Sequence, residues 1–117
     1  MPVTTVLAVI SVSDLATSQP WYERLLGKPA DITPMGSLAE WKITDSGWLQ
    51  VFQDIDRAGS SYLTLAVDDL DAEIAALAAR GLSLEEIDAD PPMRLAQIKD
   101  RDGNMITFGQ NLKGHAT

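Results

Sequence analysis

Alternating apolar and polar positions define two segments in which the same events follow one another along the chain. Val9-Ile10-Ser11-Val12 leads into Asp14-Leu15, and Thr64-Leu65-Ala66-Val67 leads into Asp69-Leu70. In both segments a period of two, typical of a strand, changes at the Asp-Leu step to helical spacing that ends at a glycine. The two aspartates lie 55 positions apart in a chain of 117 residues. Self-similarity at about half the chain length predicts two copies of one supersecondary unit.

The first unit is expected to open with a strand at about 5–12, with Leu7, Val9 and Ser11 on one face. A helix should follow at about 16–26, with its N-cap near Thr17 or Ser18, because Pro20 is tolerated only in a first turn. Its buried stripe is predicted from Trp21 and Leu25, with Tyr22 and Leu26 beside them. Three strands are then predicted, at about 30–33, 38–44 and 48–53, with a hairpin turn at 45–47.

The second unit repeats this order. We expect a strand at 62–67, a helix at 71–80, and strands at 83–88, 94–99 and 104–110, with a hairpin turn at 100–104. The order βαβββ, twice, predicts an α+β fold in which each helix covers one side of a four-stranded sheet and leaves the concave face open. The chain is interpreted as a single domain, with a first module at 1–55, a polar linker within 54–60, a second module at 61–110 and a flexible tail at 111–117.

Composition narrows the function classes. The sequence has no cysteine, which removes disulfides and cysteine-based metal or nucleophile chemistry. Its formal net charge of −8 disfavours nucleic acid and anionic membranes as partners. The N-terminal residues show neither a basic region nor a long apolar run, so we expect a cytoplasmic protein.

Three groups of residues carry a resemblance to a known superfamily: Val12-Ser13-Asp14-Leu15 with Trp21-Tyr22-Glu23-Arg24-Leu25-Leu26-Gly27, Val67-Asp68-Asp69-Leu70, and Asp100-Arg101-Asp102-Gly103-Asn104-Met105-Ile106. Together they resemble the vicinal oxygen chelate superfamily, which includes glyoxalase I, the bleomycin resistance proteins and the extradiol dioxygenases. The resemblance covers the chain except its tail. It implies two βαβββ modules with concave mixed sheets that form a cavity, but it implies no single activity.

In metal-dependent members of this superfamily, the ligands come from the first and last strands of each module. The matching positions in this sequence are Leu7, Gln50, Tyr62 and Thr107. Divalent cations prefer carboxylates and imidazoles, which this set lacks. The only histidine, His115, lies in the predicted tail. We therefore expect a metal-free member without a cofactor.

The predicted ligand site is aromatic. Trp48, Gln50 and Phe52 share one face of their strand, and Tyr62, Thr64 and Ala66 share one face of theirs. If these faces line the cavity, they suit a planar, partly apolar ligand, although the aromatic rings could instead fill space between two sheets. The candidate ligand-binding residues are Trp41, Trp48, Gln50, Tyr62, Arg94 and Thr107.

Several of these residues have a plainer interpretation. The strand of Trp41 shows no clean alternation, so the face on which Trp41 lies is not predicted. Arg94 is predicted near the cavity rim, where it could receive an anionic group, but its plainer interpretation is a salt-bridged surface residue. The acidic run at 85–90 is interpreted as an exposed edge strand protected by charge. The turn at 100–104 lacks the acidic twelfth position of a calcium loop and is interpreted as a tight turn.

Two function classes remain. The first is a metal-independent small-molecule-binding protein that sequesters an antibiotic or another planar natural product, as the resemblance implies. The second is a metal-independent lyase or isomerase, for which Tyr62 could serve as an acid and Glu40 as a base. The binding function is favoured because no matched pair of titratable groups stands out. We also expect a homodimer, since each open concave face needs a cover, with Trp48 and Tyr62 approaching each other across the subunit boundary or within one chain.

Overall fold

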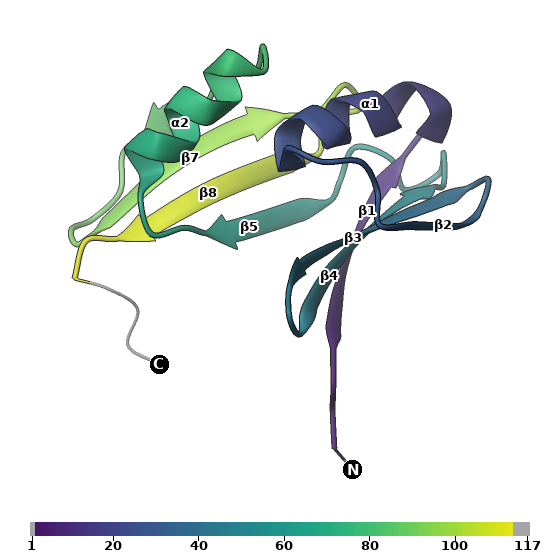
Figure 1. Ribbon diagram of the computed structural model, residues 1–117. Helices are drawn as coiled ribbons and strands as arrows, with labels where there is room; N and C mark the ends of the chain where they lie inside the picture. Colours follow the sequence, from purple (N-terminus) through teal and green to yellow (C-terminus); the bar gives the residue numbers. More distant parts are fainter. Residues whose placement is uncertain (1, 114–117) are drawn as a thin grey trace.

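The computed structural model describes residues 2–113, and each half of the chain forms one four-stranded mixed sheet with one helix packed on it (Figure 1). The elements in chain order are β1 (Val6–Val12), α1 (Leu15–Leu26), β2 (Ile32–Met35), β3 (Leu38–Thr44), β4 (Gly47–Gln53), β5 (Tyr62–Ala66), α2 (Leu70–Ala79), β6 (Glu85–Ile87), β7 (Met93–Lys99) and β8 (Met105–Asn111). The predicted α+β fold with the order βαβββ, twice, is confirmed. The tail was predicted at 111–117, but Asn111 is the last residue of β8. The part of this prediction at 114–117, with His115, lies outside the described residues.

The two sheets have the same topology. The first sheet has the order β1-β4-β3-β2, and the second sheet has the order β5-β8-β7-β6. In each sheet the first strand is parallel to the last strand of its half, and the remaining pairs are antiparallel. Figure 1 shows the two sheets beside one another, with both helices on the upper side of the molecule. The two halves therefore share one plan and can be compared position by position.

Register gives each sheet a central row of side chains that point away from the helix. In the first sheet, Val9 lies opposite Gln50, and Gln50 lies opposite Glu40. We call these three residues the first central row. The second central row consists of Thr64, Thr107 and Gln97, which pair in the same way. The two rows are equivalent, because each begins two residues after the strand position that the repeat assigns to Leu7 or Tyr62.

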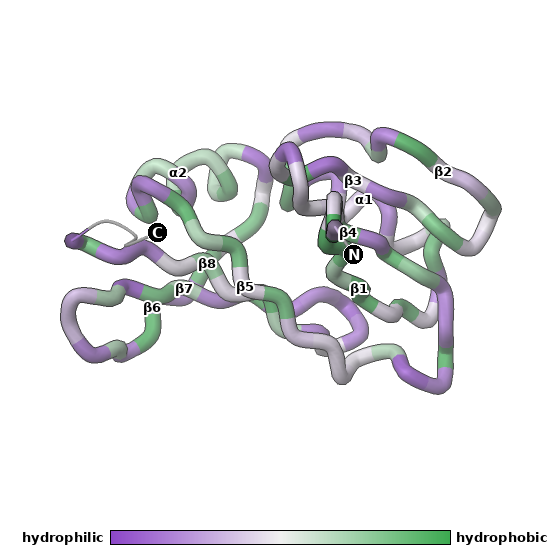
Figure 2. The backbone as a smooth tube through the Cα atoms, turned by 90° about the horizontal axis from the view of Figure 1, so that it is seen from below, coloured by the Kyte–Doolittle hydropathy of each residue, from purple (hydrophilic) through white to green (hydrophobic). Residues whose placement is uncertain are grey.

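The core lies between each sheet and its helix. Helix α1 packs on β3 and β4, and α2 packs on β7 and β8. The inward positions alternate with the outward ones, as a period of two requires. The fully buried inward side chains of the first sheet are Ile10, Val12, Ala39, Trp41, Leu49 and Val51. Figure 2 shows hydrophobic positions in both halves, on the strands and along α2.

Helix α1 begins earlier than the spacing around Pro20 predicts. Asp14 is the N-cap, and its carboxylate accepts hydrogen bonds from the Ala16 amide and the Thr17 hydroxyl. The prediction of an N-cap at Thr17 or Ser18 is wrong, since Pro20 lies inside the helix, where its missing N–H leaves the Ala16 carbonyl without a helical partner. Tyr22 is the fully buried aromatic residue of the helix, whereas Trp21 is half-buried.

The turn between β7 and β8 joins the two halves. The Asn104 side chain, which is fully buried, donates to the Ser11 carbonyl oxygen and to Asp100, and accepts from the amides of Gly59 and Ser61. All of its hydrogen-bonding capacity is thereby used. The prediction of a tight turn is confirmed, with φ +98° at Gly103. Beyond that, the turn fixes how the halves meet. Gly59, in the loop before β5, lies against this turn. No other residue fits at this position, because a Cβ would clash with the Asp102 carbonyl oxygen.

Candidate functional site

The face of each sheet opposite its helix, here called its open face, holds the candidate site. The open face of the first sheet is largely apolar. Its exposed apolar residues are Leu7, Val9, Ile32, Met35 and Phe52, with exposed fractions of 36–56%. Trp48, on the same face of β4 as Gln50, is half-buried. A single sheet face that exposes this much hydrophobic surface marks an interaction site.

A polar pair lies in the middle of this apolar face. The Gln50 amide Nε2 donates a hydrogen bond of 2.6 Å to Glu40 Oε2. Glu40 is only 8% exposed, although it is acidic and lies on the open face. Register places Val9 on the other side of Gln50, and Trp48 and Phe52 are its neighbours along β4 on the same face. The arrangement therefore combines apolar surface with one fixed polar group, as ligand-binding surfaces do.

The side chains on the open face of the second sheet are smaller and more polar than those on the open face of the first. Its central row holds the pair Gln97 and Thr107, with a hydrogen bond of 3.1 Å between Gln97 Nε2 and Thr107 Oγ1. Thr107 is buried, whereas Tyr62 at the start of β5 is 80% exposed. Neither face alone encloses a ligand, but the two differ in chemistry. The first is largely apolar around an acid, whereas the second has hydroxyl and amide groups in its central row, with the charged residues Glu85 and Lys99 beside them.

The four positions matching the metal-ligand places of the superfamily all lie on open faces. Leu7 and Gln50 are on the first sheet, and Tyr62 and Thr107 are on the second. An aliphatic side chain, an amide, a phenol and a hydroxyl do not fit a divalent metal, which takes carboxylate or imidazole ligands. Within residues 2–113, no group of three or more His, Cys, Asp or Glu side chains is arranged to hold a metal ion.

Trp41 does not lie on the open face. Its side chain is fully buried under α1, where its ring lies 6.4 Å from that of Tyr22 and its Nε1 donates to the Lys28 carbonyl oxygen at 3.0 Å. The prediction that Trp41 contacts a ligand is therefore corrected. Trp41 follows Glu40 on β3, so when Glu40 points outward Trp41 must point into the core.

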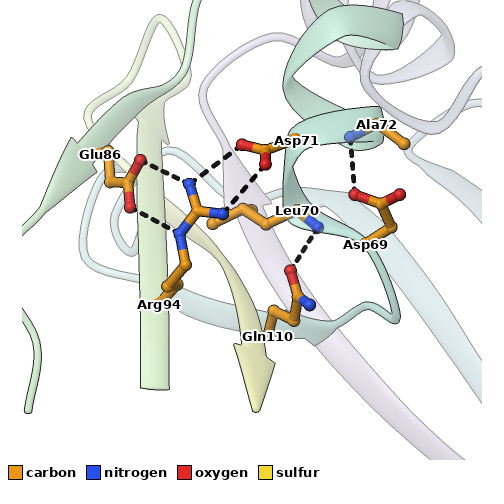
Figure 3. A network of polar contacts seen from close by, with 7 residues as sticks. All are labelled: Asp69, Leu70, Asp71, Ala72, Glu86, Arg94 and Gln110. Carbon is orange, nitrogen blue, oxygen red and sulfur yellow. Dashed lines mark hydrogen bonds and ion pairs between the residues drawn. The ribbon is translucent and has the colours of Figure 1, made fainter. Parts of the chain in front are cut away.

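Arg94 also differs from its predicted place at a cavity rim. It lies on the helix side of β7 and forms ion pairs with Asp71 of α2 at 3.0 Å and with Glu86 of β6 at 2.8 Å (Figure 3). These pairs hold the guanidinium between two carboxylates, and the hydrogen bonds from Arg94 lower the pKa of both Asp71 and Glu86. Arg94 is thus committed to α2 and the edge strand. Glu85 and Glu86, from the predicted acidic edge, are exposed.

Crevices lie between the halves. One, of about 470 Å³, is lined by residues that include Leu26, Lys42, Thr64, Glu73 and Arg80. Another, of about 170 Å³, is lined by residues that include Val6, Ala8, Trp48, Leu63 and Thr64. Trp48 therefore borders both the open face and the space between the sheets. The predicted approach of Trp48 to Tyr62 remains a prediction, since Tyr62 does not line either crevice.

Several open-face residues lie outside the candidate set predicted from the sequence, among them Val9, Phe52 and Glu40. Glu40 was considered only as a possible base. The signal for it was present, because Ala39, Trp41 and Ile43 alternate with Glu40, Lys42 and Thr44. Leu38 and the hairpin obscure this alternation at the two ends of the strand.

The repeated sheets with open faces define the class of protein, a two-module α+β fold of the glyoxalase and bleomycin resistance type. The family model of the glyoxalase-like domain matches residues 7–108, and the chain belongs to this family. No curated protein sequence gives a match.

Solved structures agree with this assignment. A glyoxalase/bleomycin resistance protein from Catenulispora acidiphila superposes with a TM-score of 0.85 at 28% identity, covering 91% of this chain and 96% of that one. TnmS3, an antibiotic-binding protein from a Streptomyces species, gives a TM-score of 0.71 at 27% identity, covering 92% and 94%. A glyoxalase/bleomycin resistance protein from Albidiferax ferrireducens, at 24% identity and a TM-score of 0.64, covers 89% and 96% and supports the fold alone.

Neither of the helices in the described part of the chain is both long enough and apolar enough to cross a membrane.

Proposed function

We propose that this chain is a metal-independent small-molecule-binding protein that sequesters an antibiotic or another planar natural product. The observation that carries the proposal is the open face of the first sheet, where aromatic and aliphatic side chains surround one fixed polar pair. Flat apolar molecules gain from contact with Trp48 and Phe52, and a hydrogen-bonding group of the ligand finds Glu40 and Gln50 between them. The similarity to an antibiotic-binding protein supports this choice within a family of many activities.

A thermal-shift screen of planar natural products tests the proposal. A ligand that binds only the folded protein should raise its melting temperature by several degrees without being turned over. Trp48→Leu should abolish most of that rise, because it removes a flat ring from the face. The control Ile55→Ala removes an exposed apolar side chain in the loop after β4 and should leave the rise intact. Product formation without added metal would contradict binding as the function.

The proposal includes the absence of a resident metal. Leu7, Gln50, Tyr62 and Thr107 offer no carboxylate or imidazole at the superfamily's ligand places, which is the reason for it. Elemental analysis of purified, untagged protein should give no stoichiometric zinc, nickel, iron or manganese, and a chelator should leave the melting temperature unchanged. One equivalent of tightly held metal would overturn this part.

We further propose that a second copy of the chain covers the open faces. The sheets lie side by side within one chain, and the exposed apolar residues of the first sheet gather on one face. Burial of such a face in a symmetric dimer would remove it from water. Light scattering should then give twice the 12.7 kDa of one chain. Val9→Asp should shift the protein towards monomer, whereas Ile55→Asp, off the face, should not. A wild-type monomer at micromolar concentration would contradict the dimer.

A further inference from the structure

Glu40 is a buried acid whose charge is not matched by a neighbouring cation. Its Oε2 accepts from Gln50, and its Oε1 accepts no hydrogen bond within residues 2–113. No Lys or Arg nitrogen of the described chain lies within the 4.0 Å of an ion pair with it. Lys42, two residues along the same face, pairs instead with Asp45 at 3.9 Å. Oε1 is not fully enclosed, so it can accept a hydrogen bond from water or from a ligand.

The fold itself does not need this charge. The position equivalent to Glu40 in the second central row is Gln97, a neutral, half-buried side chain that donates a hydrogen bond to Thr107. A neutral amide therefore satisfies the register and the cross-strand pairing at this place in the sheet. The sheet architecture therefore does not explain why position 40 carries a carboxylate and not an amide.

The surroundings indicate what the carboxylate receives. Apart from Lys42, which is paired with Asp45, the flanking residues on the open face are apolar, with Val9 across Gln50 and the rings of Trp48 and Phe52 on either side along β4. Gln50 fixes one carboxylate oxygen and leaves the other free to accept from above the sheet. A net charge of −8 raises the local concentration of cations at the surface.

We propose that Glu40 is the specificity-determining residue of the site, accepting a hydrogen bond from a protonated nitrogen on a planar ligand that lies against Trp48 and Phe52. The ligand class is thus a flat, cationic aromatic molecule, and Gln50 is the positioning residue that orients the carboxylate. This inference rests on the proposed small-molecule-binding function and adds the charge of the ligand to it.

The test uses three flat probes with the intact protein: proflavine, which is cationic at neutral pH, neutral anthraquinone, and anionic anthraquinone-2-sulfonate. Wild-type protein should bind proflavine most tightly. Glu40→Gln should weaken proflavine binding about tenfold or more, the usual value of a hydrogen bond to a charged group, and should leave anthraquinone binding unchanged. The matched control Asp56→Asn removes the same charge from an exposed loop position and should change proflavine affinity by less than about twofold.

A second measurement separates a ligand role from a structural one. Without ligand, Glu40→Gln should melt at the same temperature as wild type or a few degrees higher, because a buried charge is replaced by an amide that can still accept from Gln50. A melting temperature several degrees lower would show that the carboxylate supports the fold and would overturn the inference. So would dissociation of a wild-type dimer in this variant, which would mean that a second copy supplies the cation.

The outcomes also separate the two proposals. If wild type binds anthraquinone but not proflavine, or binds proflavine equally well with Gln at position 40, the role of Glu40 is overturned and the binding function stands. If wild type binds none of the three probes, both are overturned.

Discussion

Each half of the described chain buries one carboxylate, and the two differ in the number of hydrogen bonds that they accept. Asp100, in the turn before β8, is 6% exposed and accepts four hydrogen bonds, from the Tyr22 hydroxyl, the Asp102 amide, and the amide and side chain of Asn104. Glu40 is 8% exposed and accepts one. The register places a neutral Gln97 at the position equivalent to Glu40 and an apolar Ile43 at the position equivalent to Asp100, so neither acid is repeated in the other half.

The difference shows how a duplicated plan is divided between structure and function. A buried carboxylate surrounded by donors holds its neighbours in place, whereas one with a free oxygen on an open face is available to a partner. Asp100 connects α1 with the β7–β8 turn, so it belongs to the junction of the halves. Glu40 connects only with the adjacent strand. The two halves thus share one backbone plan, while the two acids differ in the number of donors around them.

The largest expected effect comes from Asp100. Asp100→Asn keeps the size of the side chain but replaces one acceptor oxygen with a donor that faces other donors, leaving buried groups unpaired. We expect a loss of about 3 kcal/mol or more in the free energy of unfolding. The control change Asp45→Asn, in the exposed turn between β3 and β4, should cost less than about 0.5 kcal/mol, since Asp45 is on the surface. Urea unfolding of both variants measures the contrast, and equal losses would break it.

Tyr22 should give the next largest effect. Its hydroxyl donates to Asp100 Oδ2 at 2.6 Å, and the side chain is fully buried. Tyr22→Phe should therefore cost about 2 kcal/mol, the value of a hydrogen bond to a charged group. Phenylalanine fills the same space, so the denaturant m-value should not change. A loss below about 0.5 kcal/mol would show that Asp100 is held well enough by the turn alone.

Tyr22 also predicts a pH dependence. Burial, and then the hydrogen bond to Asp100, raise the pKa of the Tyr22 phenol far above its ordinary value of 10.0. The unfolded chain can ionise this phenol above pH 10, whereas the folded protein keeps it protonated. Stability from this group is therefore complete below pH 10 and falls as pH rises above it, by about 1.4 kcal/mol per pH unit. Comparison of wild type with Tyr22→Phe between pH 8 and 11 isolates the effect, and identical pH profiles would contradict it.

How far the sequence predicts these features depends on whether they are local or long-range. Alternation and the two Asp-Leu steps are local signals, and they predicted every strand and both helices. Which face of a strand each side chain lies on was harder to predict. The sequence predicts the bounds of β3 correctly, but the inward orientation of Trp41 follows only when the alternation is counted from Ala39 onwards. The role of Asp100 could not be predicted, because it depends on contacts with residues such as Tyr22 and Ser61 that only the meeting of the halves brings near. For Arg94 the sequence allowed a salt-bridged surface role, but it could not identify the partner Asp71, which lies in another element.

The N-termini of α1 and α2 test whether equivalent residues in the two halves contribute equally to stability. Gln53 Oε1 accepts from the Leu15 amide at 2.9 Å, and Gln110 Oε1 accepts from the Leu70 amide at 2.8 Å. Both satisfy one otherwise unpaired N–H at the start of a helix. Gln53→Ala and Gln110→Ala should each cost about 1 kcal/mol, equal to within about 0.5 kcal/mol. A clear inequality by urea unfolding would show that the halves have diverged here too.

The smallest effect is expected at Arg94, whose ion pairs are found only in the second half. Arg94→Met should lower the melting temperature less than Tyr22→Phe does, because Asp71 and Glu86 face water (Figure 3). Arg94 lowers the pKa of both carboxyls from ordinary values of 3.8 and 4.5. Their contribution is therefore complete above those values and is lost as the pH falls below them. The difference between wild type and Arg94→Met should shrink in acid and in 1 M salt, and a large difference that survives both would assign Arg94 to packing of α2 on the sheet.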